Sequence, residues 1–305
     1  MKRASTTANG GVPSDRGEIV SFKPFREENA ELRSLHDRLQ AMPLLYVDGA
    51  NYIDNTDPRW EIYLALKGGA IAGFATVYSF YAYPARERLR LSQILVFPPF
   101  QRRGLASSLL ERVYADAAAG GALDLTVEDP SDEFQLLREK VDVRRLSRSE
   151  QYAGAVEDAL RKSKEMLANG MKAETLLLPT KRIYTKAESE LKIHRAQLRK
   201  LWEVLLLREL RRSGWQNADQ VVKQIVTHRL SSTASEKKLQ AASQNKHIID
   251  RNKDNFIMTR MFLPVPFPKT TEQTEEERAK ALEYDAERIG ARMVGLEKLL
   301  IGDCA

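Results

Sequence analysis

The chain has 305 residues, enough for more than one hydrophobic core, and 43% of them are hydrophobic and 30% charged, as in ordinary soluble proteins. Its one cysteine, Cys304, excludes an intrachain disulfide or a cysteine metal site and suits the cytosol or nucleus, while four scattered histidines form no metal-ligand pattern. The net charge of +6 is too mild to indicate nucleic-acid binding, no apolar run has membrane-spanning length, and no apolar core follows the basic N-terminus as in a secretory signal.

The N-terminal part predicts a tail followed by a helix. Residues 1–20 are mostly small, polar or charged and cannot bury enough apolar surface to fold, which predicts a disordered tail. Residues 27–41 carry three leucines at helical spacing, so we expect an amphipathic helix that ends at Pro43.

Strand signals and helix signals then follow one another. Runs of alternating, β-branched or aromatic residues predict three strands, which cover residues 61–67, 71–83 and 89–97. Gly68-Gly69 predicts a hairpin turn after the first of them, and Pro98-Pro99 ends the third. The spacing of apolar residues next predicts a helix at 101–118, a strand at 123–127 and a helix at 132–140. Together these elements indicate an α+β domain.

From residue 148 onward, leucine, alanine and charged residues recur at helical spacing, mainly in residues 149–169, 186–212, 217–230 and 273–300. Residues 178–188 are typical of a linker. We therefore expect three parts: the tail at 1–20, an α+β domain at 21–147 and an all-helical domain at 148–305. Basic residues outnumber acidic ones in residues 181–229, but a solvated helix face explains this, and direct nucleic-acid binding is not expected.

The segment from Ser92 to Tyr114 has the pattern of a phosphate-binding loop. A buried strand is broken by prolines, and Gln-Arg-Arg-Gly-Leu-Ala then opens a helix. The first turn of a helix offers unpaired amide hydrogens, and Gly104 lets phosphate oxygens approach them. Arg102 and Arg103 add positive charge. On the residues alone, an ordinary strand–turn–helix connection with solvent-facing arginines stays open as the alternative.

Four sequence blocks together resemble a known family. They are ANYIDNTDPRWEIYLAL, TVYSFYAYP, ILVFPPFQRRG and LDLTVEDPS, in that order. Over residues 25–140 the chain thereby resembles the histone acetyltransferase type B catalytic subunits of the Gcn5-related acetyltransferase (GNAT) superfamily. The run LKIHRAQLRKLWEVLLLREL resembles the C-terminal helices of that family more loosely. The resemblance implies a mixed, mostly antiparallel sheet flanked by helices, followed by an all-helical C-terminal domain.

The resemblance also implies acetyl-CoA as co-substrate, with no metal. The backbone of Ile94, Leu95 and Val96 would pair with the pantetheine arm. The residues that would surround the pyrophosphate are Gln101, Arg102, Arg103, Gly104, Leu105, Ala106 and Ser107. Ala106 stands where the family has a second glycine, and the two arginines replace small or polar residues.

Acids at the end of the strand predicted at 123–127 are candidates for the proton acceptor. Lysine has a pKa of about 10.4, so its amine must lose a proton before it attacks a thioester. The family places catalytic acids on a Glu-Asp-Pro triplet, which implies Glu128 and Asp129, and a third at Asp48, where the family has Glu. On the residues alone, Asp129 is also a candidate N-cap for the helix that follows. We expect direct transfer, with Glu128 as the base and a backbone N–H near Val96 donating to the developing negative charge.

The expected acceptor is a lysine of newly made histone H4 or of another basic protein, in the nucleus or cytoplasm, with a histone chaperone as a further candidate partner. The resemblance places Tyr78, Ser79 and Phe80 near the histone tail, whereas the residues alone favour sheet core for these aromatics. Five acids between Asp124 and Glu133 would attract a basic peptide.

Two other functions stay open. One is acetylation of a different amine, such as a polyamine, because only a few dozen residues precede the matched region where the family usually has an N-terminal lobe. The other is a non-catalytic acyl-CoA-binding module, because Asp48 and the QRRGLA loop depart from the family pattern.

Overall fold

The computed structural model describes residues 17–302, except residues 48, 169–176, 216 and 245–274. Its contacts divide the chain into two compact units. The first comprises Met1–Ala153 and Leu178–Leu201, and the second comprises Gly154–Leu177 and Trp202–Ala305. The first unit thus includes Leu178–Leu201, which the sequence had grouped with the helical C-terminal region.

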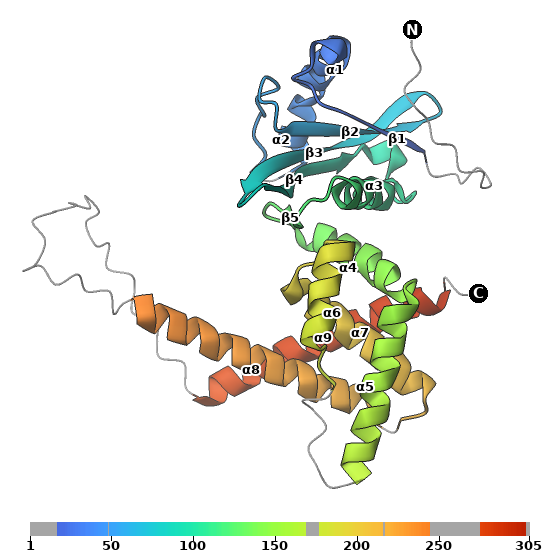
Figure 1. The fold of residues 1–305 in the computed structure, drawn as a ribbon, viewed down its shortest axis with the longest axis vertical. Coiled ribbons are helices and arrows are strands. Elements are labelled where there is room, and N and C mark those ends of the chain that lie inside the picture. Colours follow the sequence, from blue (N-terminus) through green and yellow to red (C-terminus); the bar gives the residue numbers. More distant parts are fainter. Residues whose placement is uncertain (1–16, 48, 169–176, 216, 245–274, 303–305) are drawn as a thin grey trace, which may run out of the picture. The chain divides into compact units, whose positions relative to one another are not determined.

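A five-stranded sheet forms the centre of the first unit (Figure 1). Its strands follow one another in chain order: β1 (Glu18–Phe22), β2 (Trp60–Lys67), β3 (Ala70–Ala82), β4 (Arg86–Val96) and β5 (Leu125–Val127). The first four strands are antiparallel, and β5 pairs with β4 in parallel. The sheet is therefore mixed and mostly antiparallel, as predicted.

Helices cover both faces of this sheet (Figure 1). One face packs against α1 (Ala30–Leu39) and α2 (Ala41–Tyr46), whose apolar side chains contact a cluster that includes Ile62 and Leu64. The other face packs against α3 (Leu105–Ala119) through a cluster that includes Tyr63 and Ala65. Successive residues of β2 thus point to opposite faces, and both faces are buried.

The helix α4 (Asp132–Ser147) packs beside α3 and runs further than the predicted end at residue 140. Its buried Asp142 accepts a hydrogen bond of 3.2 Å from the hydroxyl of Tyr114 on α3, and it lies within 4 Å of the guanidinium groups of Arg138 and Arg145. A buried carboxylate needs such partners because burial without them is costly. This polar cluster anchors the helix that follows the Glu128–Pro130 segment.

Two predictions for the N-terminal part were wrong. Residues 1–16 of the predicted tail lie outside the described residues, but residues 18–20, which were expected in the same tail, belong to strand β1. The segment pairs with the edge of β2, and Phe22 is buried. Pro43 does not end a helix either, because α1 ends at Leu39 and Pro43 lies in the first turn of α2, where proline is tolerated.

All the regular secondary structure that the described C-terminal residues form is helical, as predicted. The helices are α5 (Glu150–Ala168), α6 (Lys181–Lys186), a π-helical turn (Ala187–Leu191), α7 (Arg195–Arg212), α8 (Ala218–Gln244) and α9 (Glu275–Gly302). The segment at 178–188 is therefore largely helical and not the linker that was expected. Within the second unit, α8 packs along α9, and Arg229 forms a buried ion pair of 2.6 Å with Glu203. Among the described helices, none combines the length and hydropathy needed to cross a bilayer.

Candidate active site

The strands β4 and β5 separate where the candidate site begins. They pair over only three positions, from Leu89 opposite Leu125 to Leu91 opposite Val127. One further hydrogen bond of 3.0 Å joins the N–H of Glu128 to the carbonyl of Leu91. Because β4 continues to Val96, its last five residues extend beyond the end of β5.

A β-bulge determines which backbone amides in the last five residues of β4 point away from β3. Ser92 is the extra residue, since Leu91 lies opposite Val77 and Gln93 lies opposite Thr76. After the bulge, the N–H of Gln93 donates to Thr76 Oγ1 and that of Phe97 donates to the carbonyl of Ala72, so both point toward β3.

Backbone groups of a strand alternate between its two edges, so the amides of Ile94 and Val96 point to the edge away from β3. Consistent with this, the side-chain amide of Gln101 donates to the Val96 carbonyl at 2.9 Å. The bulge therefore leaves two backbone amides on an edge that β5 does not cover.

The turn after β4 ends at the exposed N-terminus of α3. Gly104 is the residue before the helix, with φ of +81°, and no atom lies within 4 Å of where its Cβ would be. Ser108 donates to the carbonyl of Gly104 at 3.0 Å, so the amides of residues 104–107 precede the first hydrogen bond of the helix. Arg102 and Arg103 are exposed, while the Leu105 side chain is buried and offers only its backbone here.

These elements enclose a pocket of about 660 Å³, which we call the edge pocket. It is lined by Tyr46, Val47, Leu91, Ser92, Ile94, Leu95, Val96, Gln101, Ala106, Val127, Glu128, Asp129, Pro130, Ser131, Glu133, Phe134 and Leu137. Five of the ten residues predicted for acetyl-CoA are in this lining, namely Ile94, Leu95, Val96, Gln101 and Ala106. The other five, residues 102–105 and 107, belong to the adjoining turn and the first turn of α3.

A second pocket of about 520 Å³, the loop pocket, lies beside the first. It is lined by Val47, Gly49, Ala50, Asn51, Tyr52, Ile53, Asp57, Trp60, Tyr78, Phe80, Arg90, Ser92, Gln93, Glu128 and Asp129. Four residues line both pockets: Val47, Ser92, Glu128 and Asp129. The two predicted acids therefore lie where the pockets meet. Asp48, the third predicted acid, lies outside the described residues.

Glu128 and Asp129 are held in different ways. Glu128 follows β5 directly, and the hydroxyl of Ser92 donates to its Oε2 at 2.6 Å. Asp129 has a φ of +32°, which is unusual for a residue other than glycine and carries a strain cost.

Asp129 does not cap α4, which excludes the structural alternative considered for it. The N-cap is Ser131, whose hydroxyl accepts a hydrogen bond of 3.2 Å from the N–H of Phe134. Ser131 has the extended backbone that an N-cap requires, and it lies directly before the helix.

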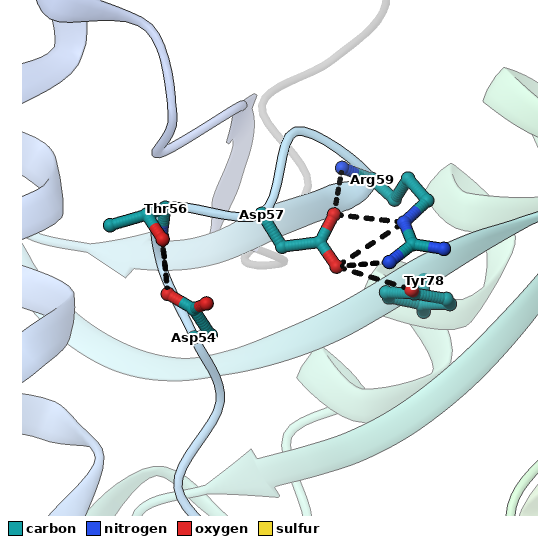
Figure 2. A network of polar contacts seen from close by, with 5 residues as sticks. All are labelled: Asp54, Thr56, Asp57, Arg59 and Tyr78. Atoms are coloured by element: carbon teal, nitrogen blue, oxygen red, sulfur yellow. Dashed lines mark hydrogen bonds and ion pairs between the residues drawn. The ribbon is translucent and has the colours of Figure 1, made fainter.

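A network of polar contacts supports one wall of the loop pocket (Figure 2). Asp57 accepts hydrogen bonds from the Arg59 guanidinium at 2.7 and 2.9 Å, and one of 3.2 Å from the Tyr78 hydroxyl. The side-chain hydrogen bonds from Arg59 lower the pKa of Asp57 to about 2. The guanidinium also lies 4.9 Å from the centre of the Tyr78 ring. In the same loop, Asp54 contacts only Thr56 among the residues drawn.

Aromatic side chains form the rest of that wall. The Tyr78 ring lies edge-on to Trp60 and to Phe80, with both centroid distances 4.7 Å. Trp60, Tyr78 and Arg90 are directly opposite one another on β2, β3 and β4, so they share one face of the sheet. The Arg90 guanidinium lies 4.6 Å from the centre of the Phe80 ring.

The predicted substrate contacts are partly brought together. Tyr78 and Phe80 line the loop pocket, but Ser79 is not part of its lining, and its N–H donates to the carbonyl of Arg59. Sequence reasoning missed several lining residues, among them Asp57, Trp60, Arg90 and Gln93. The period-two alternation of β3 and β4 could have placed Arg90 beside Tyr78, had the strand register been known. Gln93 donates to the backbone carbonyl of Asn51 at 2.8 Å and so ties the loop to the sheet.

Within the described residues, no group of three or more His, Cys, Asp or Glu is arranged to bind a metal ion. The groups that line the two pockets include carboxylates, backbone amides, an arginine and aromatic rings. A carboxylate at the junction could accept a proton from a ligand in one pocket while the amides of β4 and α3 bind a second ligand in the other.

Comparison with known proteins finds similarity to acetyltransferases. Residues 26–134 match the family model described as the Acetyltransferase (GNAT) family. The chain is 39% identical over 204 residues to the histone acetyltransferase type B catalytic subunit of Arabidopsis thaliana, covering 64% of this chain and 43% of that protein.

Two further relatives carry the same description. One from Dictyostelium discoideum is 35% identical over 159 residues, covering 48% of this chain and 32% of the relative. The protein from Rattus norvegicus is 31% identical over 208 residues, covering 64% of this chain and 45% of the relative. The chain spans less than half the length of each of these relatives.

Proposed function

We propose that this protein transfers the acetyl group of acetyl-CoA to a lysine side chain, with histone H4 as the acceptor. The match of residues 26–134 to the GNAT acetyltransferase family and the similarity to histone acetyltransferase type B catalytic subunits support this proposal. The observation that carries the proposal is the place of Glu128. It lines both pockets and accepts a hydrogen bond from Ser92, so one carboxylate faces the sites for both substrates.

The edge pocket fits acetyl-CoA, the co-substrate of GNAT acetyltransferases. The free edge of β4 offers the amides of Ile94 and Val96 to the amide groups of the pantetheine arm. The first turn of α3 offers amide hydrogens to the pyrophosphate, and nothing lies within 4 Å of the Gly104 Cβ position to block it. Arg102 and Arg103 supply positive charge for the phosphate groups. Bound there, acetyl-CoA supplies an acetyl group activated as a thioester.

Glu128 acts as the general base. Lysine is almost fully protonated at neutral pH, so a carboxylate at the junction takes the proton before or during attack on the thioester. A backbone N–H near Val96 donates to the oxygen that gains negative charge. Asp129, strained and at the same junction, is the second acid of the site. Asp57 does not share this role because hydrogen bonds from Arg59 lower its pKa to about 2, which makes it a weak proton acceptor.

The loop pocket fits the acceptor lysine. Trp60, Tyr78 and Phe80 provide apolar surface for its methylene groups, and Glu128 and Asp129 lie at the end where the amine meets the acetyl group. Long basic side chains bury their stems against such surfaces while the charged end reaches polar groups. A histone tail as acceptor places the reaction in the nucleus or cytoplasm, and a histone chaperone would be a natural further partner.

One assay tests the proposal. The protein is incubated with acetyl-CoA and, in parallel, with a histone H4 tail peptide, a polyamine or no acceptor, and release of free CoA is measured. The proposal expects turnover with the peptide alone. Turnover with the polyamine alone would identify a different amine acceptor. Tight binding of acetyl-CoA with no turnover would identify a binding module.

A substitution assigns the base. Glu128→Gln keeps the size of the side chain and removes its ability to accept a proton, so we expect kcat to fall about 10²- to 10⁴-fold, with acetyl-CoA affinity near that of the wild type by calorimetry. The matched control is Asp132→Asn, which removes an exposed carboxylate four residues away that lines neither pocket. Equal activity of wild type and Glu128→Gln would show that another group takes the proton.

A further inference from the structure

The loop pocket has an uneven distribution of charge. Three carboxylates line it, those of Asp57, Glu128 and Asp129, but the Arg59 guanidinium neutralises the first of them. Among the described residues of the lining, Arg90 alone is cationic. In the part of the chain that the structure describes, its recorded contact is with the Phe80 ring and not with a carboxylate. The Arg90 charge is therefore available to a ligand in the pocket.

The position of Arg90 relative to the reacting end of the pocket is set by the sheet. It lies two residues before Ser92 on β4, and Ser92 is hydrogen-bonded to Glu128. Two residues of a strand span about 7 Å, which is also the spacing between side chains i and i+2 on one face of an extended peptide. A lysine whose amine reaches Glu128 thus brings its flanking residues close to Arg90, beside Trp60 and Tyr78 in the same cross-strand row.

We propose that Arg90 determines specificity by charge: the site favours an amine with acidic or neutral neighbours over one with a second cation close by. This inference rests on the proposed function, because it concerns the acceptor of that reaction. A fixed positive charge repels a second cation of the acceptor and attracts a carboxylate. The rule also disfavours polyamines, which carry their charges a few bonds apart.

The expected size of the effect follows from distance and screening. Unit charges about 7 Å apart at a partly exposed site interact weakly, because water and salt screen them. Each change of one unit of charge next to the acceptor should therefore change kcat/KM about threefold to tenfold. An effect of this size is measurable with matched peptides.

The experiment uses the full chain and three peptides that carry the same acceptor lysine, flanked by Asp, by Gly or by Lys. For the wild type we expect kcat/KM to decrease in that order. Arg90→Gln should bring the three values together, and Arg90→Glu should reverse their order. Reversal is a result that misfolding or loss of packing on Phe80 cannot produce.

Arg86→Gln provides the matched control. Arg86 lies on the same strand and the same face, four residues or about 13 Å from Arg90, and it lines neither pocket. It carries the same charge but is more than a Debye length away, so its removal should keep the wild-type order of the peptides.

Two results would overturn the inference. One is a wild-type order that persists in Arg90→Glu, and the other is an equal loss of order in Arg86→Gln, which would assign the preference to the net charge of the domain. Failure of the proposed function would give a different result, because the wild type would then acetylate none of the three peptides. In that case, the order of equilibrium binding of the three peptides to wild type and Arg90→Glu, measured by calorimetry, still decides the role of Arg90.

Discussion

The two pockets that meet at Glu128 are built from different parts of the polypeptide. The edge pocket takes its polar groups from the backbone, at the uncovered edge of β4 and in the first turn of α3. The loop pocket takes its polar groups from side chains on separate segments, such as Asp57, Tyr78 and Arg90. A site built from backbone keeps its hydrogen-bonding groups when side chains change, provided that its conformation is kept. A site built from side chains changes its charge and hydrogen bonds with each substitution.

This difference predicts how each pocket can be damaged. The edge pocket should be sensitive to changes in backbone conformation, whereas the loop pocket should be sensitive to isosteric changes of charge. The first kind of change should affect the KM for acetyl-CoA, and the second the KM for the acceptor.

The largest of these effects is expected for Gly104→Ala. Gly104 has φ of +81°, where a residue with a Cβ is strained by about 1–2 kcal/mol. The turn can relieve this strain only by shifting the amides at the start of α3. The new methyl group would also occupy the open space in which the proposed pyrophosphate would lie. We expect the KM for acetyl-CoA to rise about tenfold or more, with a smaller change in the KM for the acceptor, in initial-rate measurements.

Gly121→Ala separates strain from binding. Gly121 follows the other end of α3, has φ of +69° and has no atom within 4 Å of its Cβ position. Both variants should lose similar thermal stability, but only Gly104→Ala should weaken acetyl-CoA binding. If both variants lose cofactor affinity equally, the effect comes from general destabilisation of α3 and the phosphate-binding role of this turn is wrong.

The same difference explains what the sequence could predict. The turn at Gln101–Ser107 is one contiguous segment in which strand, glycine and helix start follow in order, so its conformation could be predicted from local rules, and its phosphate-binding role stays a prediction. The Glu128-Asp129 pair was equally visible at a strand end. The fold class followed from the periodicity and the sequence blocks, because strands and helices differ in their hydrophobic period.

The loop pocket could not be predicted in the same way. Its wall depends on the register that places Trp60, Tyr78 and Arg90 opposite one another, and a single bulge residue, Ser92, changes which groups face outward. Register is a property of three strands together and is not encoded in any one of them. The role of Asp129 as an N-cap stayed open for a related reason, because Ser131 and Asp129 are both residue types that cap helices and only the backbone geometry distinguishes them.

An intermediate effect is expected for Asp57→Asn. The substitution removes the charge that binds Arg59 and weakens the support of Tyr78, while it keeps the size of the side chain (Figure 2). We expect the KM for the acceptor to rise about threefold to tenfold with little change in the KM for acetyl-CoA. Asp54→Asn is the control, since Asp54 is in the same loop but bonds to Thr56 and does not line the pocket. Equal effects of both variants would contradict the assigned role of Asp57.

The pH dependence of this network has a definite sign. Hydrogen bonds from Arg59 lower the pKa of Asp57 to about 2, so the ionised form is the one that the folded protein stabilises. The stabilisation that the ionised Asp57 carboxylate gives to the folded protein is complete above about pH 4, and it is lost as the pH falls toward 2. Asp57 therefore does not titrate near neutral pH, where the proposed acetyl transfer would be measured. Wild type and Asp57→Asn should show pH–rate profiles of the same shape, and a new inflection in the variant would show that Asp57 contributes a proton.

The smallest effect is expected for Ser131→Ala, in the segment that joins the two pockets to α4. Ser131→Ala removes the hydroxyl that accepts the Phe134 N–H and should lower the free energy of unfolding by about 1 kcal/mol. Asp129→Asn, two residues earlier, removes a carboxylate but no cap, so it should change stability much less and turnover much more. Thermal unfolding and kcat measured on both variants test this pairing. If Asp129→Asn instead destabilises the protein as much as Ser131→Ala while turnover is kept, Asp129 has a structural role, and Glu128 acts without a second acid at the junction.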